Sequence, residues 1–297
     1  MKNYLKYFYD IDNVNIYQNK SDCFFSIQNY NYKFFKYIGD INKLNDIYMF
    51  SSNLLKNGIY CHQIIKNKDQ NIVSYINGKN YILLRYYKNL DKKINIIDIL
   101  NFNFLQLKDQ KFDCSDWKTL WELKIDYFGY QLNQFGYKHP LLRESFGYYS
   151  GYVELAISLL TDLQINSNNL LLSHKRLSKD STLYDLYDPF NLILDNKVRD
   201  IAEYFKSKIF DKDIIQKIIN YFNMYQLQEY DYNLFFIRML YPSFYFDRFE
   251  KIMNNNLNDD DIEDILKNTP IYEQFIKKLY KYVSSITNIP TIEWLMY

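Results

Sequence analysis

The chain contains few of the residues that would assign it to a specialised class. It has only three cysteines, Cys23, Cys61 and Cys114, an odd number without metal-ligand spacing. No apolar run approaches the roughly 18 residues that span a bilayer. The N-terminus carries Asp10 and Asp12 where a signal peptide would have its apolar core. We therefore expect reduced thiols, no membrane span and a cytoplasmic protein.

An excess of charge of either sign is also missing. Lysine and arginine total 36 and aspartate and glutamate total 35, which leaves a formal charge of +1. A protein that binds nucleic acid through its phosphates usually carries a basic excess or a basic stripe, so nucleic acid is not an expected partner. What the chain does have is 297 residues, 48% of them hydrophobic and 19% aromatic. This composition predicts one large ordered domain or two coupled lobes.

The first 90 or so residues indicate strands around one helix. Short aromatic and β-branched runs predict strands over 23–28 and 32–38, and again over 72–76 and 80–87. Asn77-Gly78 lies between the last two runs and is a strong hairpin signal, because both residues tolerate positive φ. Helical spacing predicts a helix over 41–56, with Gly58 where a C-terminal cap belongs. The predicted order is strand pair, helix, strand pair.

Helical patterning dominates after a polar stretch at 88–93. Apolar residues three and four apart predict a helix over 116–138, begun by Ser115 or Asp116, and another over 141–163. Further helices are expected over 198–210, 212–227, 232–241, 244–256, 259–267 and 270–286. Residues 170–195 interrupt them with strand-like pieces around an irregular polar loop. This plan predicts an α+β, bilobal, protein-kinase-like fold, with a small mixed N-lobe at 1–88 and a larger, mostly helical C-lobe at 89–297.

One segment resembles a known catalytic region. Residues 170–205 read LLLSHKRLSKDSTLYDLYDPFNLILDNKVRDIAEYF and are similar to the catalytic segment of aminoglycoside-phosphotransferase-like kinases. His174 occupies the place of the motif histidine. Asp195 follows it by 21 residues, at the place of the metal-binding aspartate that ends a strand. Asp200-Ile201-Ala202 resembles the helix start that follows.

The chain is more closely similar to the spore-coat-associated, kinase-like YutH and CotS family. The similarity lies in His174-Lys175-Arg176, in the Arg-Asp-Ile-Ala-Glu run at 199–203, and in FGYYSGYVELAISLL at 146–160. It continues in WKTLWELKID at 117–126, RMLYPSFYFDRFEKI at 238–252 and the ending Ile-Pro-Thr-Ile-Glu-Trp-Leu at 289–295. The resemblance implies a part in spore coat assembly, other coat proteins as partners, and a location in the mother-cell cytoplasm and the spore coat.

The residues that transfer phosphate in such kinases are partly replaced. The catalytic-loop aspartate that accepts the hydroxyl proton corresponds to Arg176, which is permanently cationic and cannot act as a base. The asparagine that helps to hold a second Mg²⁺ corresponds to Ser181, a poorer ligand. Asp195 could still bind metal, or it could cap the following turn or pair with Arg199.

Other residues near this loop have weaker claims to a chemical role. Asp180, Asp185 and Asp188 could substitute for the missing base, although acids in loops are usually just solvated. In kinase-like folds the acid at the place of Asp200 braces the catalytic loop through hydrogen bonds to its backbone, a role that does not require catalysis. His174 belongs to the same scaffold. We therefore assign Asp200 a structural role.

The small lobe offers little to hold a nucleotide. A loop that covers phosphates needs glycines for close approach of its backbone, and the first glycine of the chain is Gly39. The lysine that grips the phosphates would be Lys33 or Lys36, whose spacing points them to opposite faces of one strand. Either lysine could equally be a solvent-exposed residue at the edge of the sheet. The usual partner of the phosphate-binding lysine is a glutamate on the following helix, and that helix offers only the shorter Asp46.

Two functions from different classes remain open. The first is a catalytically inactive, kinase-like protein associated with spore coat assembly, for which no cofactor is expected. The second is an active small-molecule phosphotransferase of the aminoglycoside or choline kinase type with a rearranged active site, which would use ATP and Mg²⁺. A regulator that binds nucleotide without transferring phosphate is a further alternative.

Overall fold

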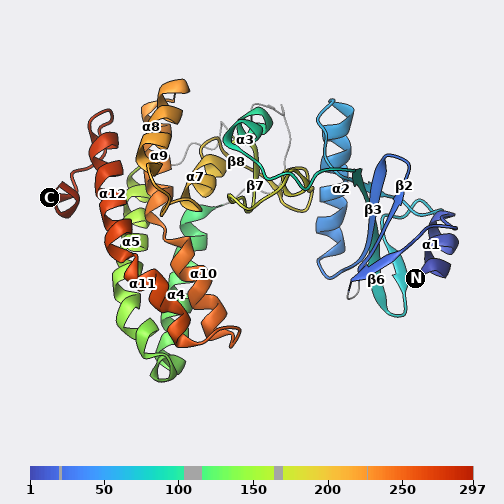
Figure 1. The fold of residues 1–297 in the computed structure, drawn as a ribbon, viewed down its shortest axis with the longest axis horizontal. Coiled ribbons are helices and arrows are strands. Elements are labelled where there is room, and N and C mark those ends of the chain that lie inside the picture. Colours follow the sequence, from blue (N-terminus) through green and yellow to red (C-terminus); the bar gives the residue numbers. More distant parts are fainter. Residues whose placement is uncertain (20–21, 104–115, 164–169, 226, 297) are drawn as a thin grey trace. The chain divides into compact units, whose positions relative to one another are not determined.

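The computed structural model describes residues 1–19, 22–103, 116–163, 170–225 and 227–296, which fall into two compact units (Figure 1). Unit 1 combines Met1–Ile94 with Asp180–Leu192. Unit 2 contains the described parts of 95–179 and 193–296. Residues 180–192 thus belong to a unit whose other described residues lie far away in the sequence. Cys114 and Ser115 lie outside the described residues.

Unit 1 is built on an antiparallel sheet. Its main path runs β1 (Tyr17–Asn19), β2 (Asp22–Ile27), β3 (Tyr30–Tyr37), β6 (Lys79–Tyr87) and β4 (Gln63–Ile65), and β5 (Ser74–Ile76) pairs with β6. The longest pairing joins β3 to β6, from Tyr30 opposite Tyr87 to Tyr37 opposite Asn80. Because side chains alternate along a strand, this sheet presents two separate faces.

A helix packs on each face of the sheet. On one face α1 (Lys2–Tyr9) inserts Leu5 among buried residues of β2, β3, β5 and β6. On the other face α2 (Ile41–Lys56) buries Leu44 and Ile47 against residues of β4 and β6. The short helix α6 (Leu183–Leu186) also belongs to this unit. The core of unit 1 therefore consists of two apolar clusters separated by the sheet.

The helix predicted over 41–56 is confirmed with the same bounds. It begins because the Asp40 side chain accepts the Asn42 N–H at 3.0 Å. It ends beside Gly58, which has a φ of +77°, a left-handed conformation that glycine adopts without strain. The strands expected over 23–28, 32–38 and 80–87 are also present, each with bounds shifted by one or two residues.

The predicted order of strand pair, helix, strand pair is present as β2 with β3, α2, and β5 with β6, but it is incomplete. The unit begins with α1, and β1 precedes the pair that the sequence indicated as the first hairpin. β4 was also missed. The two missed strands have three residues each, too few for alternation to be recognisable. The end of α1 gives no glycine signal either, because Asp10 takes the left-handed conformation there with φ 57°.

Unit 2 is mostly helical (Figure 1). Its described elements are α3 (Ile96–Asn103), α4 (Trp117–Phe135), a 3₁₀ turn η1 (Gly136–Lys138), α5 (Pro140–Leu163), the paired strands β7 (Leu170–His174) and β8 (Leu192–Asn196), α7 (Arg199–Lys206), α8 (Ile214–Met224), α9 (Glu229–Leu240), α10 (Ser243–Met253), a 3₁₀ turn η3 (Asp259–Ile262), α11 (Glu263–Lys267), α12 (Thr269–Ser284) and α13 (Glu293–Met296). Within the described residues, no helix combines the length and the apolar content that crossing a bilayer requires.

The helices predicted after residue 93 are all present, with ends shifted by up to a few residues, and the one over 259–267 begins as the 3₁₀ turn η3. Asp116 caps α4 as expected and accepts the Thr119 N–H at 3.1 Å. The sequence did not predict α3, α6 or α13, which are short and carry little periodic signal. Aromatic stacking fills the core, as where Tyr149 lies 4.0 Å from Tyr245 between ring centroids.

Candidate functional site

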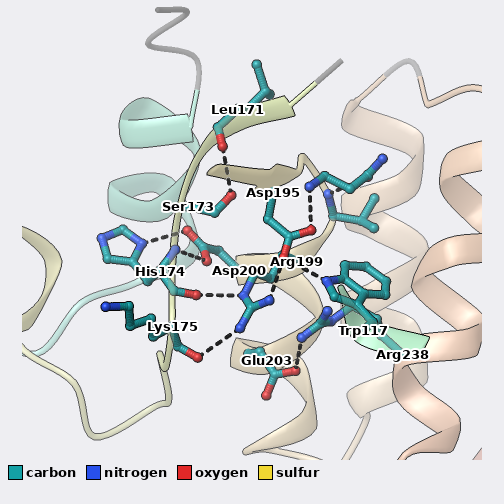
Figure 2. Close-up of polar contacts among 12 residues, drawn as sticks. Trp117, Leu171, Ser173, His174, Lys175, Asp195, Arg199, Asp200, Glu203 and Arg238 are labelled. Atoms are coloured by element: carbon teal, nitrogen blue, oxygen red, sulfur yellow. Dashed lines mark hydrogen bonds and ion pairs between the residues drawn. The ribbon is translucent and has the colours of Figure 1, made fainter. Parts of the chain in front are cut away.

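Asp195 lies near the end of β8 and is 4% exposed (Figure 2). Its Oδ1 accepts the Asn196 N–H at 2.6 Å. Its Oδ2 accepts Trp117 Nε1–H at 2.7 Å and Arg199 Nη1–H at 2.5 Å. Both carboxylate oxygens therefore interact with donors of the chain itself, and the charge has a cationic partner four residues later.

The Arg199 side chain connects β8 and α7 to the loop after β7. Besides bonding Asp195, it donates Nε–H to the His174 carbonyl at 2.7 Å and an Nη2–H to the Lys175 carbonyl at 3.0 Å (Figure 2). A guanidinium is suited to this role because it presents several donors in one rigid plane. The backbone just before Arg176 is thus fixed by the same group that neutralises Asp195.

Asp200 holds the other side of this loop. One of its oxygens accepts the His174 backbone N–H at 2.9 Å, and the other lies 2.7 Å from His174 Nδ1 (Figure 2). Both residues are buried, and the His174 ring packs against Phe102 with a centroid distance of 4.8 Å. This is the contact between helix start and loop that the resemblance implies for a bracing acid.

A buried ionic cluster that the sequence gave no reason to expect lies next to Asp195. Glu203 accepts from Arg238 at 2.7 Å and from Lys206 at 3.1 Å. The Arg238 guanidinium lies over the Trp117 ring, 3.8 Å from its centroid. This arrangement connects α9 to α7, and through Trp117 to Asp195. Its only sequence signal was the i, i+3 spacing of Glu203 and Lys206 on α7.

The charges of this cluster shift one another's titration. Burial lowers the pKa of Lys206 to about 8, although the Glu203 carboxylate opposes the shift. Burial alone would raise the pKa of Glu203, but the Lys206 and Arg238 cations beside it bring that pKa well below its usual range. Burial, followed by the charge of Arg199, lowers the pKa of Arg238. Glu203 therefore stays ionised and stabilises the two cations around it.

Arg176 and Ser181, which the sequence resemblance aligns with the catalytic aspartate and asparagine, belong to different units. The Arg176 side chain is 74% exposed and lies 3.5 Å from the Asp247 carboxylate on α10. Ser181 belongs to unit 1, where its carbonyl accepts the Ile94 N–H at 3.0 Å.

The three acids considered as substitute bases all have local roles in unit 1. Asp180 pairs with Lys93 at 2.6 Å. Asp185 closes a capping box at the start of α6, where it accepts the Thr182 N–H at 2.7 Å. Asp188 accepts the backbone N–H two residues later at 3.0 Å. Each of these contacts is one that a loop acid makes for structural reasons.

The two candidate lysines lie on opposite faces of β3, as their spacing predicts. Lys33 shares the α2 face with Phe35 and lies 4.9 Å from that ring's centroid. Its ammonium is 3.2 Å from Asp22 on the neighbouring strand. Lys36 lies on the α1 face, opposite Tyr81 of β6. The sequence offered Asp46 of α2 as the partner of the phosphate-binding lysine. The structure instead pairs Lys33 with Asp22 of β2.

Residues 180–192 cover part of this α2 face. Tyr184 packs against His62 and Tyr86, with centroid distances of 4.6 and 4.9 Å. Its backbone N–H bonds to the Leu90 carbonyl at 2.9 Å, just after β6. Phe190 packs edge-on against Phe35 at 5.8 Å. Aromatic side chains of the chain's own later segment thus occupy this face.

The two described cysteines, Cys23 and Cys61, are free and buried. Burial raises the pKa of both thiols, that of Cys61 to about 12. A thiol with so high a pKa forms little of the reactive thiolate. The described residues also contain no group of three or more His, Cys, Asp or Glu side chains placed to hold a metal ion.

Comparison with solved structures identifies the fold. The chain is similar to an aminoglycoside phosphotransferase from Alicyclobacillus acidocaldarius, with a TM-score of 0.64 and 7% identity over 92% of this chain and 93% of that one. It is also similar to a spectinomycin phosphotransferase solved with ADP and spectinomycin (TM-score 0.56, 12% identity, 96% and 98% covered). A microcompartment-associated aminopropanol kinase gives a TM-score of 0.57 at 9% identity, with 96% and 97% covered. The chain therefore has the kinase-like fold of these proteins.

The family follows from the sequence. The model of the family described as "Spore coat putative kinase YutH" matches residues 2–279, and the chain belongs to this family. The family assignment and the α+β kinase-like fold expected from the sequence are thus confirmed. No curated protein sequence matches the chain significantly.

Proposed function

We propose that this protein is a catalytically inactive member of the kinase fold that takes part in spore coat assembly. The observation that carries the proposal is the ion pair between Arg199 and Asp195. A metal-binding aspartate must offer its oxygens to Mg²⁺, whereas both oxygens of Asp195 accept hydrogen bonds from Asn196, Trp117 and Arg199. Mg²⁺ would have to compete with a guanidinium that is already in place.

Two further observations support the loss of catalysis. Arg176 carries a permanent positive charge at the place of the base and is largely exposed beside Asp247. Lys33, on the α2 face of β3, pairs with Asp22, and its neighbour Phe35 packs against Phe190. Phosphoryl transfer depends almost wholly on positioned charges. With a cation at the place of the base and Lys33 paired to Asp22, the charges that transfer requires are missing.

The part in coat assembly rests on the family. Its description names the spore coat, and we extend that association to this chain. We propose other coat proteins as its partners, and the mother-cell cytoplasm and the spore coat as its location. No cofactor is part of this proposal.

An active phosphotransferase is the second candidate, and one observation favours it. Asp195 is retained at the end of β8, and displacement of Arg199 from it would restore a carboxylate at that place. The substrate would then be a small hydroxyl compound, and ATP and Mg²⁺ would be required. A regulator that binds nucleotide without transfer needs the same displacement.

Thermal unfolding with and without MgATP tests the proposal. We expect the same melting temperature in both conditions, because a ligand stabilises a protein only if it binds the folded state. Stabilisation of about 2.7 kcal/mol at a hundredfold excess over the dissociation constant would show nucleotide binding and contradict this expectation. MgATP-dependent phosphorylation of a small hydroxyl compound that is lost in Asp195→Asn would favour the second candidate.

A further inference from the structure

The outer edge of strand β2 is covered over only half of its length. β1 pairs with β2 from Asp22 to Phe24, and no described strand pairs with this edge beyond Phe24. If the pairing continued, Asn15 would lie opposite Ser26, but the described backbone hydrogen bonds include none between these two residues. The segment that leads into β1 therefore departs from the sheet here and leaves the second half of the β2 edge open.

Ser26 directs its backbone N–H and C=O towards this open edge. β2 and β3 form a hairpin in which Ile27 lies opposite Tyr30 across a two-residue turn. The residues that flank such a turn form a hydrogen-bonded pair, and the pairs alternate from there, so Phe25 and Ile27 bond to β3 while Ser26 points away from it. Ser26 is exposed, and its backbone groups have no hydrogen-bond partner among the described residues. Its N–H and C=O therefore offer one complete pairing position for another strand.

A cavity of about 770 Å³ lies at this open edge. Its lining includes Phe25, Ser26 and Ile27 of β2 and residues 12–15 of the segment that leads into β1. The cavity therefore opens between β2 and the segment that departs from it, and we refer to it as the β2 groove. Ligand sites in proteins commonly have volumes of about 300–1,000 Å³, so the β2 groove is large enough for a short stretch of peptide.

We propose that the β2 groove binds an extended segment of a partner protein, which pairs with Ser26 and so adds a strand to the sheet. The N–H and C=O of one strand residue are matched by the C=O and N–H of another extended residue, and an open strand edge therefore recognises a strand. The edge of a second folded sheet does not fit, because it would bring a neighbouring strand into the place of residues 12–15. The occupant is therefore a single extended chain.

The two faces of the sheet specify the side chains of this partner segment. Its residue opposite Ser26 shares a face with Ser26 and with Asn31, the residue next to Ser26 on β3. The residues on either side of it share the opposite face with Phe25 and Ile27. On that face Phe25 is buried, and Val14 of the groove lining packs against the same apolar cluster. We therefore expect the order apolar, polar, apolar over three residues of the partner segment.

The side of the β2 groove away from β2 carries polar side chains. Asp12, Asn13 and Asn15 belong to its lining. A side-chain amide both donates and accepts hydrogen bonds, so Asn13 and Asn15 are suited to bond the backbone groups on the second edge of the bound segment. The inference goes beyond the proposed function, which assigns no surface to a partner. Its test uses no nucleotide, so either proposal can fail without the other.

Amide hydrogen exchange of the full chain, followed by NMR, tests the open edge first. We expect the Ser26 N–H to exchange at least about tenfold faster than the N–H groups of Phe25 and Ile27, because only the latter two donate to β3. A Ser26 N–H that exchanges as slowly as its neighbours would show that the edge is already covered and would overturn the proposal.

Peptides selected on the full chain from a phage-displayed library of random short peptides then serve as the probe. We expect enrichment of sequences with the order apolar, polar, apolar, and the strongest synthetic peptide should slow Ser26 exchange at least about tenfold. Ser26→Pro removes the outward N–H, a change that an edge strand tolerates, and should weaken peptide binding at least about tenfold. Ser26→Ala is the matched control. It loses the hydroxyl that donates to Asn31 at 2.7 Å but keeps the backbone groups, and its affinity should stay within about twofold.

Circular dichroism checks that both variants are folded. If Ser26→Pro does not fold, the protection of the Ser26 N–H in the complex of the wild type with the peptide decides by itself. A library that enriches no peptide overturns the proposal, as does a peptide that binds Ser26→Pro as tightly as the wild type or that leaves Ser26 exchange unchanged. Slower exchange of Ser26 at high concentration of the chain alone would assign the β2 groove to a second copy and overturn the proposal as well.

Discussion

At the scale of single residues, a buried carboxylate needs a cation or several donors nearby, and Asp195 has both. Arg199 supplies the charge, and Trp117 and the Asn196 backbone supply further hydrogen bonds. The same guanidinium satisfies two carbonyls of the loop after β7. The carboxylate that the sequence resemblance aligns with a kinase's metal-binding aspartate is here part of the packing of unit 2.

Arg199→Ala should therefore destabilise the protein strongly. It leaves Asp195 buried without its cation and deprives two carbonyls of their donor, a type of change that costs about 3–5 kcal/mol. Urea unfolding followed by circular dichroism measures the difference. Arg176→Ala is the control, because its contact with Asp247 is long and exposed, and its cost should stay within about 0.5 kcal/mol. Equal effects of the two substitutions would show that the buried pair has no special role.

His62 makes stability depend on pH. It is fully buried, donates Nε2–H to the Tyr184 carbonyl at 2.9 Å, and burial lowers its pKa to about 3. The unfolded chain protonates this histidine near its ordinary pKa of about 6.5. Between those values the unfolded state binds the extra proton, so stability falls as pH falls below about 6.5.

The expected contribution of His62 is about 2 kcal/mol of lost stability between about pH 7 and pH 5. Unfolding free energies of the wild type and of His62→Gln at both pH values measure it. The substitution should remove this part of the pH dependence, while the contributions of the carboxylates cancel in the comparison. Identical pH dependence in the two proteins would contradict the burial of a neutral His62.

At the scale of elements, the ends of helices follow local chemistry. Asp40 and Asp116 cap the starts of α2 and α4 with their side chains, and both were visible in the sequence as acids before a periodic run. Gly58 follows α2 with positive φ. By contrast, Gly129 lies inside α4, where glycine has no conformational purpose and a Cβ would meet nothing within 4 Å.

These two glycines should respond to alanine in opposite directions. Gly129→Ala is expected to stabilise the protein by about 0.5–1 kcal/mol, because alanine loses less backbone entropy in a helix. Gly58→Ala is expected to destabilise it by about 1 kcal/mol or more, because its φ of +77° strains any residue with a Cβ. Thermal melting of both variants gives the two signs. A loss of stability in Gly129→Ala would indicate a close neighbour at that surface.

At the scale of the whole molecule, unit 1 is not a continuous piece of sequence. Tyr184 and Phe190 pack with the apolar cluster on the α2 face, and the backbone of residues 181–184 bonds to residues 90–94. Unit 1 therefore depends on a segment that the chain supplies some 90 residues later.

A fragment of residues 1–94 should consequently be incomplete. We expect it to bind a hydrophobic dye and to melt at low temperature, because the α2 face lacks its cover. Addition of a peptide of residues 180–192 should raise its melting temperature, since the peptide binds only the folded fragment. A variant peptide with Tyr184→Ala and Phe190→Ala serves as the control. A fragment that is fully stable alone would show that the later segment is dispensable.

Much of the architecture was predictable, and the failures share one cause. The long helices and the strands β2, β3 and β6 can be recognised in the sequence from their periodic apolar residues. The elements that were missed are short: β1 and β4 have three residues each, α6 and α13 have four, and α1 and α3 have eight. Such segments are held by neighbours in space rather than by their own pattern. The candidate site also has a local part, which the sequence could indicate, and a distant part, which it could not. Arg199 is four residues from its partner Asp195, whereas Trp117, which also bonds Asp195, is 78 residues away.

The sequence by itself determined the family and the α+β kinase-like plan. That Arg176 and Ser181 replace a kinase's base and second metal ligand stays a prediction from the resemblance. The family and the plan follow from local periodicity and from residue order, which a linear chain records directly. Only the tertiary structure decided that Trp117 reaches Asp195, that Arg238, Glu203 and Lys206 form a buried cluster beside it, and that residues 180–192 complete unit 1. The physical reason is that burial and ionic pairing depend on side chains brought together from distant parts of the chain, and no local pattern encodes which ones meet.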